Sequence, residues 1–163
     1  MRSNRFQLNS AKTEILWSTS SCCLDQLPQI ALRIRSVHVA PSVVVRDLGL
    51  LLDADVSMKS HVMRTVSLTC FFVLRQLRPI RRSVPRPVLQ SLVVSLVLSR
   101  LDYGNAMLVG IPQHLLQRLY SVINSAERLI YPLSRFSHTT PLLQRLHWLK
   151  AKERIDFKVT VCV

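Results

Sequence analysis

The chain has 163 residues, enough for about one domain, and 48% of them are hydrophobic, so it can bury a core and is not disordered as a whole. Its 22 lysines and arginines outnumber its 9 acidic residues and give a net charge of +13. An enzyme that acts on neutral metabolites does not need this excess, whereas a partner with a phosphate backbone favours it. The three glycines form no phosphate-binding loop, which excludes the common nucleotide-binding motifs.

Cysteine and histidine patterns indicate an intracellular chain. Cys22 and Cys23 are adjacent, no CxxC motif occurs, and the five histidines lack metal-ligand spacing. Residues 1–10 contain no apolar stretch typical of a signal peptide, and no segment reaches the about 20 apolar residues that cross a bilayer. We therefore expect an intracellular protein, nuclear or cytoplasmic and not secreted, without membrane association, cofactor or resident metal ion.

Up to about residue 56 the hydrophobic pattern has the period of two that is typical of strands. Residues 15–17, 32–39 and 43–52 predict three short antiparallel strands, with Gly49 as a bulge or a point of close backbone approach. A polar loop is expected at residues 18–29. The sequence thus predicts a short antiparallel β segment over residues 1–56.

From Ser57 to Pro79 apolar residues recur at intervals of three and four, which predicts one amphipathic helix. Its expected buried stripe consists of Met58, Val62, Val66, Cys70, Val73 and Leu77. We expect Ser57 to cap this helix and Pro79 to end it. Asp53 and Asp55 precede the helix, where their charges favour the positive end of its dipole. A two-metal site at this carboxylate pair is the less favoured alternative.

Helical patterning continues to the end of the chain. The segment from Pro87 to Asp102 is apolar nearly all round, which predicts a buried core helix with three serines as a ridge for close packing. Further helices are predicted at residues 112–130, 140–149 and 151–161. Residues 57–163 are therefore expected to form a helical bundle, and the whole chain an α+β fold.

Arginines are concentrated at the end of the first predicted helix. Four of them fall within eight positions: Arg75, Arg78, Arg81 and Arg82. No Asp or Glu occurs between Lys59 and Arg100, and an anionic partner would relieve the repulsion among these cations. The chain has 17 arginines and 5 lysines, which favours bidentate phosphate contacts. The pattern indicates nucleic-acid binding, with a merely solvated charged face as the alternative.

Four short strings occur in a defined order along the chain: LNSAKTE at residues 8–14, VRDLGL at 45–50, SRLDY at 99–103 and LHWL at 146–149. Together they resemble the C-terminal part of the reverse transcriptase of LINE-type (non-LTR) retrotransposons, over about residues 6 to 159. The resemblance implies that Lys12 lies near the incoming nucleotide at the end of the palm. It also implies a primer-grip hairpin at residues 45–50 and a thumb, holding the template–primer duplex, from Ser57 onward.

The resemblance does not extend to catalysis. Reverse transcriptases hold two metal ions on an aspartate pair in an F/Y-x-D-D turn, and this chain contains no Asp-Asp dipeptide. The family's catalytic segment would precede residue 1. The chain is therefore expected to be a fragment of an RNA-directed DNA polymerase without activity of its own. It would bind RNA–DNA or DNA duplexes with low specificity and self-associate through the surface that the palm would cover.

Local departures from the family pattern occur at Gly104, where cysteine is common, and at Lys150, where proline is common. The expected nucleic-acid-binding residues are Lys12, Arg46, Lys59, Arg64, Arg75, Arg78, Arg81 and Arg82. The primer-grip-like residues are Arg46, Asp47, Leu48 and Gly49. Three alternatives remain open: a helical protein-interaction module, a translated retroelement remnant without function, and a polymerase whose catalytic half is encoded upstream.

Overall fold

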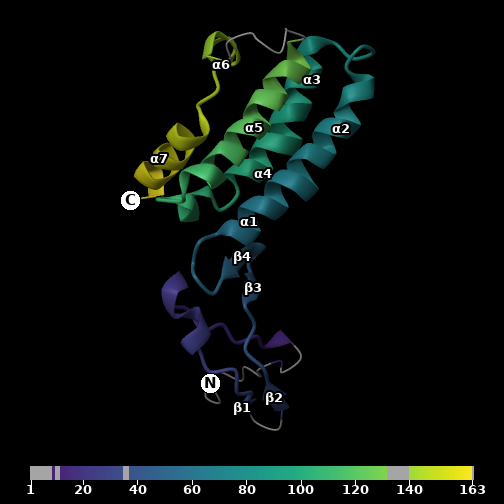
Figure 1. Ribbon diagram of the computed structural model, residues 1–163. Coiled ribbons are helices and arrows are strands. Elements are labelled where there is room, and N and C mark those ends of the chain that lie inside the picture. The colour runs from purple at the N-terminus through teal and green to yellow at the C-terminus, as the bar shows by residue number, and fades with distance from the viewer. Residues whose placement is uncertain (1–8, 10–11, 35–36, 132–139, 163) are drawn as a thin grey trace. The chain divides into compact units, whose positions relative to one another are not determined.

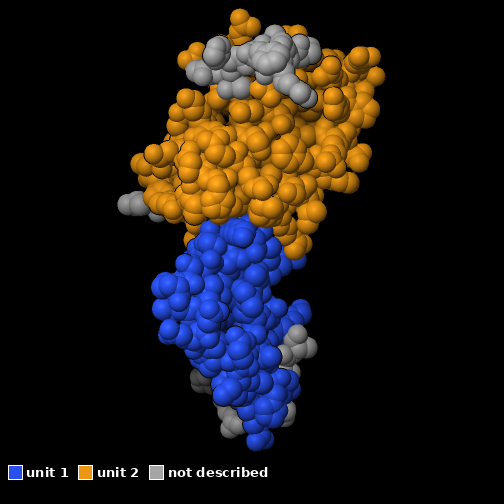
Figure 2. All heavy atoms as spheres, viewed as in Figure 1, with its two compact units in different colours: residues 1–60 blue, residues 61–163 orange. Residues whose placement is uncertain are grey.

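The computed structural model describes residues 9, 12–34, 37–131 and 140–162, and the chain divides into two compact units, residues 1–60 and 61–163 (Figure 2). Among the described residues, the first unit contains two antiparallel strand pairs and the second is helical (Figure 1). The predicted α+β class is confirmed. The hydrophobic pattern of the sequence predicts a change from strands to helices at residue 57, which is close to the boundary between the two units.

Two short hairpins replace the strands expected at residues 32–39 and 43–52. In the first, β1 (Leu32–Ile34) pairs with β2 (Val37–Val39), and in the second β3 (Val44–Asp47) pairs with β4 (Leu50–Asp53). Leu48 and Gly49, with φ values of 44° and 89°, form the turn between β3 and β4. Two consecutive positive φ angles match the right-handed twist of hairpin strands. Gly49 is therefore a turn residue, and its expected place in a bulge is wrong.

The start of the first unit contains less strand than expected. Ile15 makes an isolated parallel bridge to Pro41, and the segment predicted as a polar loop includes a 3₁₀ helix, η3 (Ser21–Gln26). Of the described residues up to 57, only Asp53 and Ala54 are buried. Strands of three or four residues present too little surface to cover a core, so this unit is thinly packed.

A continuous helical run confirms the helix expected after Ser57, with a different start. It consists of α1 (Lys59–Arg64), the π-helical segment η4 (Thr65–Cys70) and α2 (Phe71–Ile80), and ends just past Pro79. Met58 has a φ of 58°, so helical geometry begins at Lys59. The cap predicted at Ser57 is wrong, because an Asp53 carboxylate oxygen accepts the Ser60 backbone N–H at 3.0 Å. Asp55 accepts the N–H of Ser57, also at 3.0 Å. Hydrogen bonding with the Ser57 side chain, and then with this backbone N–H, lowers the pKa of the Asp55 carboxyl.

The helical run contains a π-helical segment, and its buried stripe differs from the predicted one at a single position. The Phe71 N–H donates to the Val66 carbonyl, five residues back, so the turn contains more residues than an α-helical turn. In α2, Leu74 is buried, whereas Val73, the predicted member of the stripe, is only half-buried. The other members of the predicted stripe are buried as expected.

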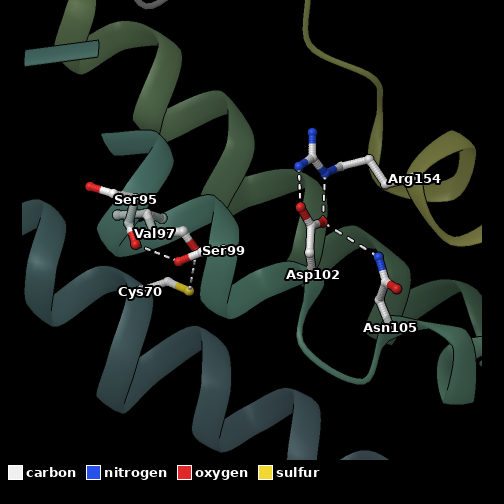
Figure 3. Close-up of polar contacts among 7 residues, drawn as sticks. All are labelled: Cys70, Ser95, Val97, Ser99, Asp102, Asn105 and Arg154. Carbon is white, nitrogen blue, oxygen red and sulfur yellow. Dashed lines mark hydrogen bonds and ion pairs between the residues drawn. The ribbon is translucent and has the colours of Figure 1, made fainter. Parts of the chain in front are cut away.

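The segment expected as a buried core helix has one open side. It forms α3 (Arg86–Val93), a second π-helical segment η5 (Val94–Leu98), and α4 (Ser99–Asp102). Val88, Val94 and Leu96 are exposed, so the prediction of burial all round is wrong. Its three serines (91, 95 and 99) are exposed as well and donate to carbonyls of their own helix, as Ser99 does to Ser95 (Figure 3). The predicted close packing of this serine ridge is therefore wrong, because the three serines are exposed in the described part of the chain.

The remaining predicted helices are confirmed. The longest, α5 (Gln113–Ile130), packs against α2, α3, η4 and α7 (Figure 1). Before it lies a 3₁₀ helix, η6 (Asn105–Leu108), and after it come α6 (Thr140–Leu146) and α7 (Ala151–Cys162). The segment α6 ends earlier than expected because His147 has a φ of 55°. None of the helices in the described ranges has the length and hydropathy that a bilayer crossing requires.

Candidate nucleic-acid interface

A groove of about 430 Å³ lies in the second unit between α2 and the C-terminal half of α5. Its lining consists of Phe71, Leu74, Arg75, Arg78, Arg81, Ser125, Arg128 and Leu129. Four of these residues are arginines, and none of the described lining residues is acidic. We call this feature the arginine groove.

The local sequence explains why the arginines of α2 surround an apolar floor. Arg75 and Arg78 are three positions apart and therefore share one helix face. Leu74 and Leu77 are buried and fix α2 on the bundle, which leaves Arg75 and Arg78 exposed. Leu74 and Leu129 contribute apolar surface to the same groove. The result is a hydrophobic floor with a cationic rim, which suits the alternating sugar and phosphate surface of a nucleic-acid backbone.

A second depression, of about 340 Å³, extends this basic surface. Arg81, Arg82 and Arg86 line it, and it shares Arg81 and Leu129 with the arginine groove. The guanidinium carbon of Arg86 lies 4.9 Å from the centre of the Tyr131 ring, a cation–π geometry that restrains this side chain. The two depressions therefore form one continuous surface with six arginines.

The nearest acidic residue in sequence does little to neutralise this surface. Glu127 precedes Arg128 on α5, but its side chain is fully buried. Neither of its carboxylate oxygens has a hydrogen-bond partner among the described residues. Burial raises the pKa of Glu127 to about 7, against the opposing effect of the Arg128 charge. Burial thus favours the neutral form of the Glu127 carboxyl, so this side chain offsets little of the positive charge on the surface.

The structure brings together half of the predicted nucleic-acid-binding residues. Arg75, Arg78 and Arg81 line the arginine groove, and Arg82 lines the adjoining depression. Arg64 is exposed at the end of α1 and is outside both linings. The prediction omitted Arg128, although its position on the polar side of the helix at 112–130 was visible in the sequence. No local pattern shows that this helix packs beside α2.

The other predicted residues lie in the first unit: Lys12, Arg46, Asp47, Leu48, Gly49 and Lys59. Lys12 is exposed, and Lys59 is the exposed first residue of α1. Residues 45–50 form the tip of the β3–β4 hairpin, where Arg46 and Asp47 are exposed strand residues and Leu48 and Gly49 make the turn. None of these residues belongs to the arginine groove.

Within the described part of the chain, no three His, Cys, Asp or Glu side chains come close enough together to hold a metal ion. Comparison with known proteins gives no family assignment. The chain matches no protein-family model, no curated protein and no solved structure.

Proposed function

We propose that this chain binds the phosphate backbone of a nucleic-acid duplex, RNA–DNA or DNA, without sequence preference. The observation that carries the proposal is the convergence of four arginines from α2, its C-terminal end and α5 on one groove, with no acid among its described lining residues. Arginine presents a planar fork of donors that matches phosphate oxygens, and such contacts are charge-assisted. Contacts to the backbone position a duplex but carry no sequence information, which accounts for the low specificity.

We further propose which kind of protein carries out this duplex binding. The chain is the thumb-side part of a LINE-type reverse transcriptase, and its arginine groove contacts the template–primer duplex in the nucleus or cytoplasm. Support comes from the four strings in their order along the chain and from a hairpin followed by cationic helices. Polymerisation itself is not part of the proposed activity, because the chain contains no aspartate pair of the F/Y-x-D-D type.

A salt titration with a charge-matched control tests duplex binding. The groove variant replaces Arg75, Arg78 and Arg81 by glutamine. The control variant replaces three exposed arginines elsewhere in the helical unit by glutamine: Arg100, Arg118 and Arg145. Both variants lose three positive charges, but only the first changes the arginine groove. We expect the slope of log affinity against log salt, measured with a labelled RNA–DNA duplex, to flatten by about 2 to 3 in the groove variant, because each lost phosphate contact removes about 0.9.

The control variant should change that slope by less than about 1, since its arginines make no phosphate contact in the proposed complex. Circular dichroism checks that all three proteins have the same helix content. Equal slopes for the groove variant and the control would end the proposal for this surface.

We expect no primer extension by the 163-residue chain on RNA or DNA templates with Mg²⁺ or Mn²⁺. Asp53 and Asp55 are close together in the sequence, but Asp53 accepts the N–H of Ser60 in α1 and Asp55 that of Ser57 just before it. Incorporation is measured with a radiolabelled primer on a homopolymer template. Template-dependent extension that disappears when Asp53 and Asp55 become asparagine would contradict this expectation.

The exposed apolar side chains of Leu68 and Phe72 favour a second candidate function, protein interaction. They are four residues apart in η4 and α2, and 70% and 57% of their surfaces are exposed. Such a pair fits an apolar partner surface, including that of a second copy of this chain. This candidate predicts salt-insensitive association, measured by analytical ultracentrifugation, that is lost when Leu68 and Phe72 become serine. The duplex titration would be unaffected by these two substitutions.

A further inference from the structure

The turn between α2 and α3 carries an exposed serine, Ser83, beside the arginine-lined surface of the helical unit. Its backbone N–H donates to the Ile80 carbonyl at 2.9 Å, which closes the turn directly after α2. The residues on either side of it, Arg82 and Val84, both line the second depression, which Arg81 connects to the arginine groove. A group attached to the Ser83 hydroxyl would therefore lie at the edge of the proposed duplex-binding surface.

Ser83 is accessible to an enzyme in a way that the other serines and threonines of this unit are not. Among the described residues from 61 onward, it is the only serine or threonine outside a helical segment. Ser91 and Ser125, for example, donate their hydroxyls to carbonyls four residues earlier in α3 and α5. A modifying enzyme needs a segment that can extend across its active site, and a turn can do so without the unwinding of a helix.

The sequence around Ser83 is strongly cationic. Residues 75–86 contain five arginines and no acidic residue, and two of these arginines, Arg81 and Arg82, immediately precede Ser83. Protein kinases select their substrates in part by charge, so a kinase with an acidic substrate groove favours this segment. Exposure, a turn and flanking arginines thus coincide at a single hydroxyl group.

We propose that Ser83 is a phosphorylation site for an arginine-directed protein kinase, and that its phosphorylation blocks duplex binding. The second part rests on the function proposed above. In the reaction, Ser83 Oγ attacks the γ-phosphorus of ATP, and the bond to the oxygen that bridges the β- and γ-phosphates breaks. ADP leaves, and the hydroxyl proton passes to the catalytic aspartate of the kinase. The modification adds a control over the surface that binds the duplex.

The phosphate on Ser83 competes with nucleic acid for the same arginines. A phosphoserine carries a charge of about −1.5 to −2 at pH 7 and three strong acceptor oxygens. Arg82 is its chain neighbour, and Arg86 lies three positions further on at the start of α3, with both side chains exposed. Pairing with these guanidinium groups neutralises about two of the six arginine charges on the surface and repels the phosphates of a duplex.

In vitro phosphorylation of the full chain tests the site. The chain is incubated with ATP and an arginine-directed kinase, protein kinase C, and the products are mapped by tandem mass spectrometry. Phosphate is expected on Ser83. Ser83→Ala should lose this phosphate, whereas Ser91→Ala, which changes an exposed serine within α3, should keep it. Absence of phosphate from Ser83 would overturn the proposal.

Duplex titrations with a charge-matched control test the effect on binding. One sample carries phosphoserine in place of Ser83 and the control carries it in place of Ser99, both introduced during translation. Ser99 is exposed and lies outside both depressions. Phosphoserine at position 83 should weaken binding of the labelled RNA–DNA duplex about tenfold and flatten the salt slope by about 2, because two phosphate contacts are lost. The control should flatten the slope by less than about 1.

Phosphorus NMR tests the pairing with arginines in the absence of nucleic acid. The second pKa of phosphoserine is about 6, and nearby guanidinium groups lower it because they stabilise the dianion. The titration midpoint of the phosphate on Ser83 should lie about half a pH unit or more below that of the phosphate on Ser99. Replacing Arg82 and Arg86 by glutamine should remove most of this difference. Equal midpoints for the two phosphates would refute the pairing.

These measurements distinguish a failure of the phosphorylation site from a failure of duplex binding. If the unmodified chain binds no duplex, the proposed function is refuted, while mass spectrometry and NMR still decide whether Ser83 is modified and paired with arginines. If the unmodified chain binds the duplex and phosphoserine at position 83 changes neither the affinity nor the salt slope, control by phosphorylation is refuted and duplex binding stands.

Discussion

Replacing Glu127 by glutamine is expected to remove most of the change in the free energy of unfolding between pH 5 and pH 8. The Glu127 carboxyl is fully buried, its oxygens have no hydrogen-bond partner among the described residues, and its pKa is raised from 4.5 to about 7. A raised carboxyl pKa means that the folded chain holds a proton which the unfolded chain releases. Stability therefore falls as the pH rises through the interval between the two pKa values.

The expected size of this effect follows from linkage. Below pH 4.5 both states are protonated and Glu127 costs no ionisation energy. Above the folded-state pKa of about 7 the full cost is present, about 3 kcal/mol from 1.36 kcal/mol per pKa unit. Glutamine has nearly the same shape but does not ionise. At pH 8 the variant should therefore exceed the wild type in stability by up to about 3 kcal/mol, and at pH 5 by about 1 kcal/mol or less.

Urea denaturation followed by circular dichroism, at half-unit intervals from pH 5 to pH 8, measures this difference. Asp156→Asn is the matched control, because Asp156 is an exposed carboxylate on α7. The control should show the same pH profile as the wild type. A Glu127→Gln variant that keeps the wild-type slope with pH would place the pH dependence elsewhere in the chain.

Leu74→Ala is expected to destabilise the helical unit by about 2 to 5 kcal/mol, the usual cost of truncating a buried leucine. Leu74 is 7% exposed and helps to hold α2 on the bundle. Val73→Ala should cost about 1 kcal/mol or less, because Val73 is only half-buried. This order is the opposite of that expected from the periodic stripe in the sequence. It reflects the burial of Leu74 in place of Val73 between Cys70 and Leu77, which are both buried as predicted.

The chemically identical control for Leu74→Ala is Leu68→Ala, since Leu68 lies in η4 with 70% of its surface exposed. It should change the free energy of unfolding by no more than about 0.5 kcal/mol. Chemical denaturation at one pH measures all three variants. A larger loss for Val73→Ala than for Leu74→Ala would mean that Val73, and not Leu74, belongs to the buried stripe.

The sequence by itself determined the class of the fold and the approximate position of its helices. Periodicity located the helix at residues 112–130 nearly to its observed bounds, because this segment has a strongly amphipathic pattern that begins after Pro112, and a last helix was expected at residues 151–161, where α7 lies. The strand pattern predicted a single strand over residues 43–52 and missed the hairpin turn at Leu48 and Gly49, although Asp-Leu-Gly at the tip of an apolar run is a turn signal and the family resemblance implied a hairpin at residues 45–50. The net charge and the arginine cluster around Pro79 were also evident from the sequence alone.

Only the tertiary structure decided which side chains act together. Arg128 joins Arg75 and Arg78 because α5 packs beside α2, a choice that depends on the fit of whole helix faces. The same holds for Asp102 and Arg154, which are 52 positions apart in the chain and meet where α7 packs beside η6. Local periodicity in the sequence predicts which face of a helix is buried, but not which helix packs against that face. A groove between two helices can therefore be located only from the tertiary structure.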